Sequence, residues 1–427
     1  MPIRQVARLV DPVTRGWAVV TAGSVARLAL GFVASVLIAR ALGPAGFGVF
    51  AVLGAVANVV GAVADLGLTD AAVKRIAGVW PARPELARER ARAFFWLRAG
   101  VAALVVAAGS LLVVLTARSI AGPSEIGALL PLALLGVGAT ALSGAVSAIL
   151  QATGRFGRLS LVALTNAGLT AALAIALGRA GRLTLVSALV LLGIGTSLAS
   201  FATGRRLLPG GWRLDFPGGA ALREEGRELV RFGRWLWIAN SFAMLAAQLD
   251  VLLLNRWSGA ATVGAYALAL NLATKVDVVN SSLYTVLLPA ASSLHGERGV
   301  RRYVRQGLVR SALIGAALLP TIPLCAPFIT FFYGAAYAPA IALFRGLLGV
   351  VIFDVVTTPL LLLSYHYNRP KLLAGADALR AGTVALVGAG LIPSAGAAGA
   401  ITARLCARFA GAGLILTALA RQRRAED

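Results

Sequence analysis

Long apolar runs dominate the pattern of hydrophobic and polar positions along this chain. Charged residues or Gly and Pro turns bound each run, and each is about 20 residues long, which a helix needs to cross about 30 Å of hydrocarbon. The pattern predicts twelve transmembrane helices, at residues 17–39, 46–66, 95–116, 127–150, 160–178, 183–203, 235–256, 264–288, 311–333, 339–363, 372–391 and 397–419.

Composition supports a lipid environment for most of these residues. Of the 427 residues, 59% are apolar and 13% are charged, whereas soluble domains carry roughly 25% charged residues. The mean hydropathy is +0.83. A soluble globular protein is therefore excluded, and the sequence predicts an all-α polytopic membrane protein.

The formal net charge of +23 comes from 40 Lys and Arg against 17 Asp and Glu. Sorted by alternate connections between the predicted spans, 29 of the basic residues fall on one side and five on the other, and six lie inside spans. Because Lys and Arg accumulate in cytoplasmic connections, both termini are predicted to be cytoplasmic. This distribution favours a topology signal over a nucleic-acid surface, and no nucleic-acid partner is expected.

An internal repeat divides the chain into two halves. Residues 40–51 align with residues 256–267 at an offset of 216, with Arg, Gly, Ala, Gly, an aromatic residue and Ala coinciding. Six spans per half is an even number, so the two six-helix lobes are expected to be related by a pseudo-two-fold axis along the membrane normal. Chance matching in an Ala- and Gly-rich chain is the alternative explanation.

The repeat sets the expected domain boundaries. Residues 1–204 form an N-lobe of spans 1–6, residues 205–234 form a cytoplasmic linker, and residues 235–427 form a C-lobe of spans 7–12. Two Pro-Gly-Gly sequences, at 209–211 and 217–219, predict a flexible linker. Residues 222–234 then mix Glu with Arg in a pattern typical of a short helix on the membrane surface.

Enzyme chemistry has little support in the sequence. The predicted outer connections are short, so no large extracytoplasmic loop can cover a glycan polymerase or transferase site. Phosphate-binding loops, nucleophile elbows and HExxH motifs are absent from the sequence. Two cysteines, Cys325 and Cys406, lie in apolar runs, and two histidines, His295 and His366, cannot form a metal site alone. No cofactor or metal is expected, and the chain is predicted to be a transporter.

Charged residues inside the predicted spans are the candidate functional groups. Each costs about 2.5 to 3.5 kcal/mol at a helix centre on insertion scales, so each needs a partner or a water-filled cavity. Six are basic, namely Arg27, Lys275, Arg345, Arg380, Arg404 and Arg408, and four are acidic, namely Asp250, Asp277, Asp354 and Asp377.

Helical spacing sorts these charges. Asp377 and Arg380 are three residues apart, which predicts an ion pair within one helix. Lys275 and Asp277 lie about 200° apart on their helix, and Arg345 is likewise on the opposite face from Asp354, so these pairs cannot neutralise each other locally.

Arg404 and Arg408 are four residues apart, which places two like charges on one helix face. That face requires a wet cavity, an anionic ligand, or acids from another helix, with Asp277 and Asp354 as the candidate partners. Arg27, flanked by Gly23 and Gly31, predicts a cavity wall, the alternative being contact with backbone carbonyls or an acid of the other half.

Lys275 belongs to a polar stripe on span 8 that predicts a lumen, with polar contacts between helices as the alternative. The stripe contains Asn271, Thr274, Lys275, Ser281, Ser282 and Thr285.

Several segments, in this order and spacing, resemble the oligosaccharide (Wzx-like) flippases, the polysaccharide biosynthesis proteins of the multidrug/oligosaccharidyl-lipid/polysaccharide exporter superfamily. The segments are Ala39–Gly48, Asp65–Leu68, Leu150–Arg155, Leu249–Leu254, Val263–Tyr266, Phe332–Gly334 with Tyr337, and Ile392–Ala400. The resemblance implies two six-helix lobes around a central cationic cavity, and alternating access that carries a polyprenyl-pyrophosphate-linked oligosaccharide across the bacterial inner membrane.

Arginine forks match phosphate oxygens, so the embedded cations are the expected head-group ligands. The predicted substrate-binding residues are Arg27, Lys275, Arg345, Arg404 and Arg408, and Asp277 and Asp354 are predicted to couple transport to a proton or sodium gradient. The expected partners are the lipid-linked oligosaccharide, membrane lipids and glycan-assembly enzymes, with the protein acting as a monomer. The alternatives are a multidrug cation antiporter of the same fold, a flippase for the peptidoglycan precursor, or a membrane glycan polymerase.

Overall fold

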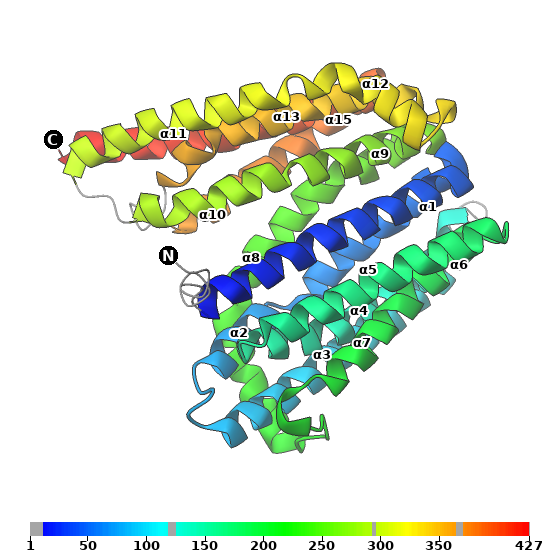
Figure 1. Cartoon of the computed structure of the whole chain (residues 1–427), viewed down its shortest axis with the longest axis vertical. Coiled ribbons are helices and arrows are strands. Elements are labelled where there is room, and N and C mark those ends of the chain that lie inside the picture. Colours follow the sequence, from blue (N-terminus) through cyan, green and yellow to red (C-terminus); the bar gives the residue numbers. More distant parts are fainter. Residues whose placement is uncertain (1–11, 118–124, 293–295, 364–369, 427) are drawn as a thin grey trace, which may run out of the picture. The chain divides into compact units, whose positions relative to one another are not determined.

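A computed structural model describes residues 12–117, 125–292, 296–363 and 370–426, all of whose long elements are helices (Figure 1). Some residues used for the predicted orientation and inventory lie outside these ranges, namely Arg4, Arg8, Arg118, His295, His366 and Arg369. Within the described part, every one of the twelve predicted spans lies on helix. The prediction of an all-α polytopic membrane protein is confirmed.

Unbroken helices account for the simplest spans. Span 3 lies on α3 (Pro84–Ala117), span 4 on α4 (Glu125–Ala152), span 5 on α5 (Phe156–Arg179), span 7 on α8 (Gly219–Trp257) and span 10 on α13 (Pro339–Leu361). Each is long and apolar enough to cross a membrane.

Two long helices each contain two predicted spans separated by a kink at glycine. α1 (Pro12–Asp65) breaks at Gly43, where φ is 64°, and α15 (Pro370–Glu426) breaks at Gly396, where φ is 54°. These backbone angles are accessible to glycine at little cost because it has no Cβ. Spans 1 and 2 are therefore joined by a turn at Gly43, and spans 11 and 12 by a turn at Gly396.

Three spans are interrupted. Span 6 comprises α6 (Leu185–Ser187), the π-helical η2 (Ala188–Gly195) and α7 (Thr196–Arg206). Span 8 comprises α9 (Ala260–Val276) and α10 (Val278–Ser292), which break at Asp277. Span 9 comprises α11 (Gly296–Leu318) and α12 (Thr321–Phe332), which meet at 41°, and the turn η4 (Ala335–Tyr337) follows.

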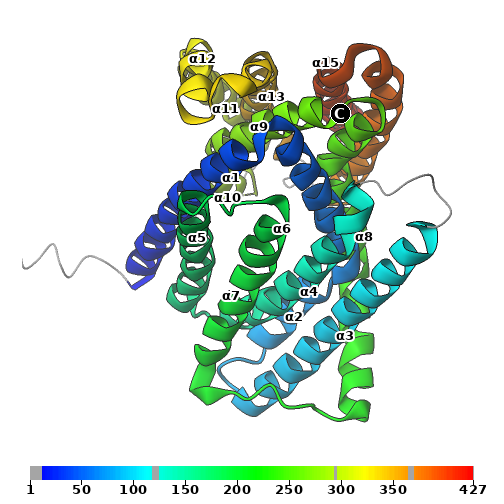
Figure 2. The ribbon, with the colours of Figure 1, turned by 90° about the vertical axis from the view of Figure 1, so that its right-hand side faces the viewer.

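The described chain divides into two compact units. The first contains residues up to Leu42 together with Ala57–Asn240, and the second contains Gly43–Val56 together with Ser241 onward. In the first unit, α3, α4 and α7 lie side by side (Figure 2). In the second, α11, α13 and α15 lie side by side (Figure 1).

The core of the first unit includes the start of α8. Leu229 of α8 is fully buried in the same cluster as Leu68, Phe94 and Ile149. The predicted short helix at 222–234 is therefore present, but it continues into span 7 without a break. Both halves of one helix thus contribute to the packing of their respective units.

The linker before α8 is held in place rather than loose, which differs from the expected flexible linker. Trp212, just after η3 (Pro209–Gly211), packs edge-on against Trp80 at 5.6 Å between ring centroids, and Phe216 packs against Trp96 at 5.6 Å. The indole of Trp96 donates to the Leu214 carbonyl at 2.9 Å. Aromatic packing and this hydrogen bond outweigh the flexibility of the Pro-Gly-Gly sequences.

Ion pairs also fix the start of α8 to α2 (Leu68–Ala77). Arg75 donates from Nε to Glu225 at 2.8 Å and from Nη1 to Glu228 at 3.3 Å. The hydrogen bond that Arg75 donates to Glu225 raises the pKa of the Arg75 guanidinium above its ordinary value. The charges of residues 222–234 therefore serve, in part, to attach this helix to the first unit.

Candidate functional site

Arg404, on the second leg of α15, is held by the fully buried Asp250 of α8. Its Nε donates to Asp250 Oδ2 at 2.8 Å, and its Nη2 lies 2.7 Å from the same oxygen and donates to the Ala247 carbonyl at 2.9 Å. The hydroxyl of Tyr266, on α9, also donates to Asp250 Oδ2, and the Val251 N–H donates to Oδ1 at 2.8 Å. The sequence proposed Asp277 or Asp354 for Arg404, but the observed partner is Asp250.

Arg408, one turn further along α15, pairs with Asp354 of α13. Arg408 Nε lies 3.1 Å from Asp354 Oδ2, and the Arg408 side chain remains 31% exposed. Asp354 is thus the counter-charge of Arg408, as one of the sequence alternatives proposed. The two like charges of residues 404 and 408 are tolerated on one helix face because each has a buried acid from a different helix.

The predicted pair within the first leg of α15 is confirmed. Arg380 Nη1 lies 2.9 Å from Asp377 Oδ1. The Arg380 side chain crosses the second leg of α15 at Gly411, where an added Cβ would lie 2.5 Å from Arg380 Nε. Glycine at 411 therefore makes room for Arg380 beside Arg404 and Arg408.

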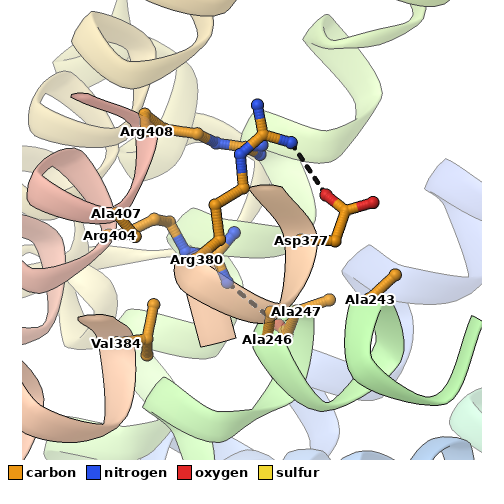
Figure 3. A pocket seen from close by; sticks show the side chains of 9 residues that line it. All are labelled: Ala243, Ala246, Ala247, Asp377, Arg380, Val384, Arg404, Ala407 and Arg408. Carbon is orange, nitrogen blue, oxygen red and sulfur yellow. Dashed lines mark hydrogen bonds and ion pairs between the residues drawn. The ribbon is translucent and has the colours of Figure 1, made fainter. Parts of the chain in front are cut away.

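These three arginines surround a cavity of about 170 Å³ in the second unit. In Figure 3 their side chains converge from both legs of α15, with Asp377 beside them and the small residues of α8 below. The lining residues are Ala243, Ala246, Ala247, Asp377, Arg380, Val384, Arg404, Ala407 and Arg408. One water needs only roughly 10 to 15 Å³ of such space, so the cavity is large enough for a small polar group.

The cavity lining is more basic than the full set of charged residues around it, in which each of the three arginines has its own aspartate. Asp250 and Asp354 pair with Arg404 and Arg408 but are not among the lining residues, whose charged side chains are three guanidinium groups and one carboxylate. Within the described residues, Arg404 Nη1 and Arg380 Nη2 make no hydrogen bond, and Arg380 Nε is buried without an acceptor. Of these groups, Arg404 Nη1 and Arg380 Nη2 are the donors left for an anionic ligand, because Arg380 Nε is packed against Gly411.

Asp277 and Lys275 lie at the break of span 8. Asp277 follows the last residue of α9, and its Oδ1 is buried without a hydrogen-bond partner among the described residues. Lys275 Nζ donates to the Asn271 side chain at 2.6 Å rather than to a carboxylate. Neither residue is among those that line the cavity.

The remaining predicted cations lie elsewhere. Arg27 is an exposed residue of α1 in the first unit. Arg345 of α13 is exposed and donates from Nε to the Ile322 carbonyl at 3.3 Å. Of the five predicted substrate-binding residues, the structure places two, Arg404 and Arg408, around this cavity.

Sequence reasoning missed three members of the site. Arg380 was assigned only to its pair with Asp377, and Asp250 and Tyr266 were not assigned as partners of Arg404. An embedded acid followed sixteen residues later by a tyrosine was visible in the sequence, but the pairing depends on contacts between α8, α9 and α15. Among the described residues, no group of three or more His, Cys, Asp or Glu is placed to hold a metal ion.

The sequence matches the model of a family described as polysaccharide biosynthesis protein over residues 13–295. None of the curated proteins matches the chain at a significant level.

Solved structures of transporters share its fold. An inward-facing multidrug resistance MATE family transporter of the MOP superfamily matches with a TM-score of 0.72 and 16% identity, covering 93% of this chain and 95% of that one. The lipid II flippase MurJ in an inward closed conformation matches with a TM-score of 0.70 and 13% identity, covering 94% and 87%. A MOP superfamily transporter from Pyrococcus furiosus, reported with a binding pocket of reverse polarity, matches at 0.63 and 16% identity, covering 96% and 95%.

Proposed function

This chain belongs to the polysaccharide biosynthesis protein family and has the fold of MOP superfamily transporters, and from this premise we propose that it is a flippase rather than an enzyme. Its substrate is a polyprenyl-pyrophosphate-linked oligosaccharide, which it moves across the bacterial inner membrane by alternating access. The observation that carries this proposal is the cavity lined by Arg380, Arg404 and Arg408.

Arginine is suited to the pyrophosphate head group of such a lipid. Its planar fork donates two parallel N–H bonds to phosphate oxygens and stays charged at any physiological pH. A multidrug cation antiporter of the same fold would require an acidic lining, whereas three of the four charged residues here are basic. The cavity chemistry therefore favours an anionic substrate over a cationic drug.

Flipping is tested with purified protein in liposomes that contain a fluorescent polyprenyl-pyrophosphate oligosaccharide. Wild-type protein should expose the inner-leaflet pool of this lipid to an impermeant quencher added outside. Loss of one charge-assisted bond should weaken substrate binding by about 1.5 to 3 kcal/mol, so Arg408→Gln should raise the substrate concentration needed for half-maximal flipping. Arg408→Lys should restore part of the effect, because lysine restores the charge without the fork.

Two controls separate binding from folding. Arg408→Gln combined with Asp354→Asn removes the charge from both partners, so it should keep the melting temperature while the substrate requirement stays raised. Arg345→Gln removes an arginine outside the cavity lining and should flip like wild type. Wild-type liposomes that export cationic dyes but leave the glycan lipid in place would refute the proposal in favour of the antiporter.

We also propose that Asp277 takes up the coupling proton or sodium ion. Asp354 is neutralised by Arg408 at 3.1 Å, whereas Asp277 has a buried oxygen that lacks a partner among the described residues. A buried carboxylate oxygen without a donor is costly unless a proton or cation satisfies it. This makes Asp277 a better supported coupling residue than Asp354, although both were candidates from the sequence.

The coupling proposal is tested by measuring flipping in liposomes with imposed pH or sodium gradients. Asp277→Asn should remove the response to one of these gradients while keeping the melting temperature. Asp354→Asn should mainly lower the melting temperature, because it leaves the Arg408 charge without its acid. An unchanged gradient response in Asp277→Asn would show that this acid has no coupling role.

A further inference from the structure

The three acids around the cavity differ in how firmly they are held. Asp250 has no exposed side-chain surface and accepts bonds from Arg404, Tyr266 and the Val251 N–H. Asp354 is 11% exposed beside Arg408. Asp377 is 34% exposed, and its described hydrogen bond is the one from Arg380 Nη1.

Exposure decides which of these carboxylates can leave its arginine. Separating a fully buried pair strands an uncompensated charge away from water, which is strongly unfavourable. A partly exposed carboxylate can exchange its arginine for water at little cost, because exposed ion pairs contribute little net stability. Asp377 is also the acid that lines the cavity, whereas Asp250 and Asp354 do not line it.

Arg380 is placed so that it can donate hydrogen bonds both to Asp377 and to a ligand in the cavity. Its side chain passes closely over Gly411, so the guanidinium is held between the two legs of α15. Its Nε is buried without an acceptor among the described residues. Nε is therefore closed off by Gly411, Nη1 donates to Asp377, and Nη2 is left as a donor for a ligand in the cavity that Arg380 lines (Figure 3).

We propose that Asp377 is the exchangeable counter-ion of this cavity, and that an incoming phosphate group displaces its carboxylate from Arg380 and is bound by Arg380, Arg404 and Arg408. The proposal deepens the proposed function and rests on it for the identity of the natural ligand, a prenyl pyrophosphate. In the empty cavity, Asp377 balances the charge of Arg380, as Asp250 and Asp354 balance those of Arg404 and Arg408. A doubly charged phosphate competes with this carboxylate for Arg380 more effectively than a singly charged carboxylate does.

The test measures binding of inorganic pyrophosphate to the full-length protein in nanodiscs by calorimetry. Asp377→Asn removes the competing charge and should bind pyrophosphate about fivefold more tightly than wild type, which corresponds to about 1 kcal/mol. Asp377→Glu keeps the carboxylate and should bind like wild type. Arg380→Gln should lose about tenfold or more in affinity.

A matched control comes from the other unit. Asp65 pairs with Arg98 at 2.9 Å and is 20% exposed, so Asp65→Asn breaks a comparable pair far along the chain from the cavity residues. This variant should leave pyrophosphate binding unchanged. Melting temperatures of all variants are measured alongside, and Arg380→Lys, which keeps the charge, should recover part of the affinity if the loss in Arg380→Gln is a binding effect.

The nanodisc lipids distinguish the source of the phosphate group. Measurements in phosphatidylcholine alone and with added phosphatidylglycerol should give the same fivefold ratio. Competition from phosphatidylglycerol would overturn the assignment to a prenyl pyrophosphate, because membrane phospholipid would then occupy the cavity. Equal affinity of wild type and Asp377→Asn would overturn the exchange itself.

The failure of this inference differs from the failure of the proposed function. Wild-type flipping of the glycan lipid with pyrophosphate binding insensitive to residue 377 rejects the exchange and leaves the flippase standing. Pyrophosphate binding that responds to residue 377, in a protein that flips no pyrophosphate-linked glycan, rejects the flippase and leaves an anion site of the predicted composition.

Discussion

Arg404 and Asp250 form an ion pair in which the acid has no exposed surface and the arginine side chain is 14% exposed. Such a pair contributes less to net stability than its geometry suggests, because both charges lose their hydration. Removing only one of the two charges is strongly destabilising, because the other charge is then buried without a partner. Arg404 therefore has a structural role in addition to its proposed contact with the substrate.

We expect Arg404→Gln to destabilise the protein by about 3 to 5 kcal/mol, the usual cost of stranding one member of a buried pair. Asp250→Asn should have a similar effect, and the double variant should recover much of the loss because neither charge remains. Thermal unfolding in detergent measures this cycle. Additive losses in the double variant would contradict a direct coupling between the two residues.

At the scale of helices, two glycines at equivalent positions of the internal repeat lie at the same helix contact. Gly48 and Gly264 are 216 residues apart in the alignment, and both belong to the second unit. A Cβ added to Gly48 would overlap the Ala260 carbonyl, and one added to Gly264 would overlap the Pro44 carbonyl. The helix ends at these positions therefore pack backbone against backbone, as small residues permit between membrane helices.

Gly48→Ala should lower stability by about 1 to 3 kcal/mol, because the added methyl group forces this contact apart. Gly54→Ala is the matched control on the same leg of α1, since a Cβ there meets nothing within 4 Å. Melting temperatures of the two variants give the comparison. Equal melting temperatures would show that the two helix ends can separate without cost.

At the scale of the whole molecule, the 29 to five division of basic residues predicts the orientation in the membrane. Arg223, in the connection before span 7, and Arg256, the last residue of this span, are both exposed and are expected on opposite sides. In a background with Cys325 and Cys406 replaced by serine, Arg256→Cys should react with an impermeant thiol reagent added to intact cells. Arg223→Cys should react only after the cells are opened, and the reverse pattern would overturn the predicted topology.

Local sequence was enough to predict the spans and the pairing within one helix. Hydrophobic length placed all twelve spans on helix in the described part of the chain, because crossing a bilayer requires about 20 apolar residues whatever the tertiary structure. The i,i+3 spacing of Asp377 and Arg380 predicted their ion pair, because neighbours on one helix face are fixed by helix geometry.

Tertiary structure decided what spacing could not. Arg404 and Asp250 are 154 residues apart, and no periodicity indicates which of the four embedded acids an arginine from another helix will meet. The Pro-Gly-Gly linker shows the same limit, since the contacts of Trp212 and Phe216 with Trp80 and Trp96 hold a segment that local propensity leaves free. The sequence by itself thus determined the spans, the repeat and the inventory of buried charges. The packing of α8, α13 and α15 determined which of these charges are neutralised and which line the cavity, because those contacts join residues that are distant along the chain.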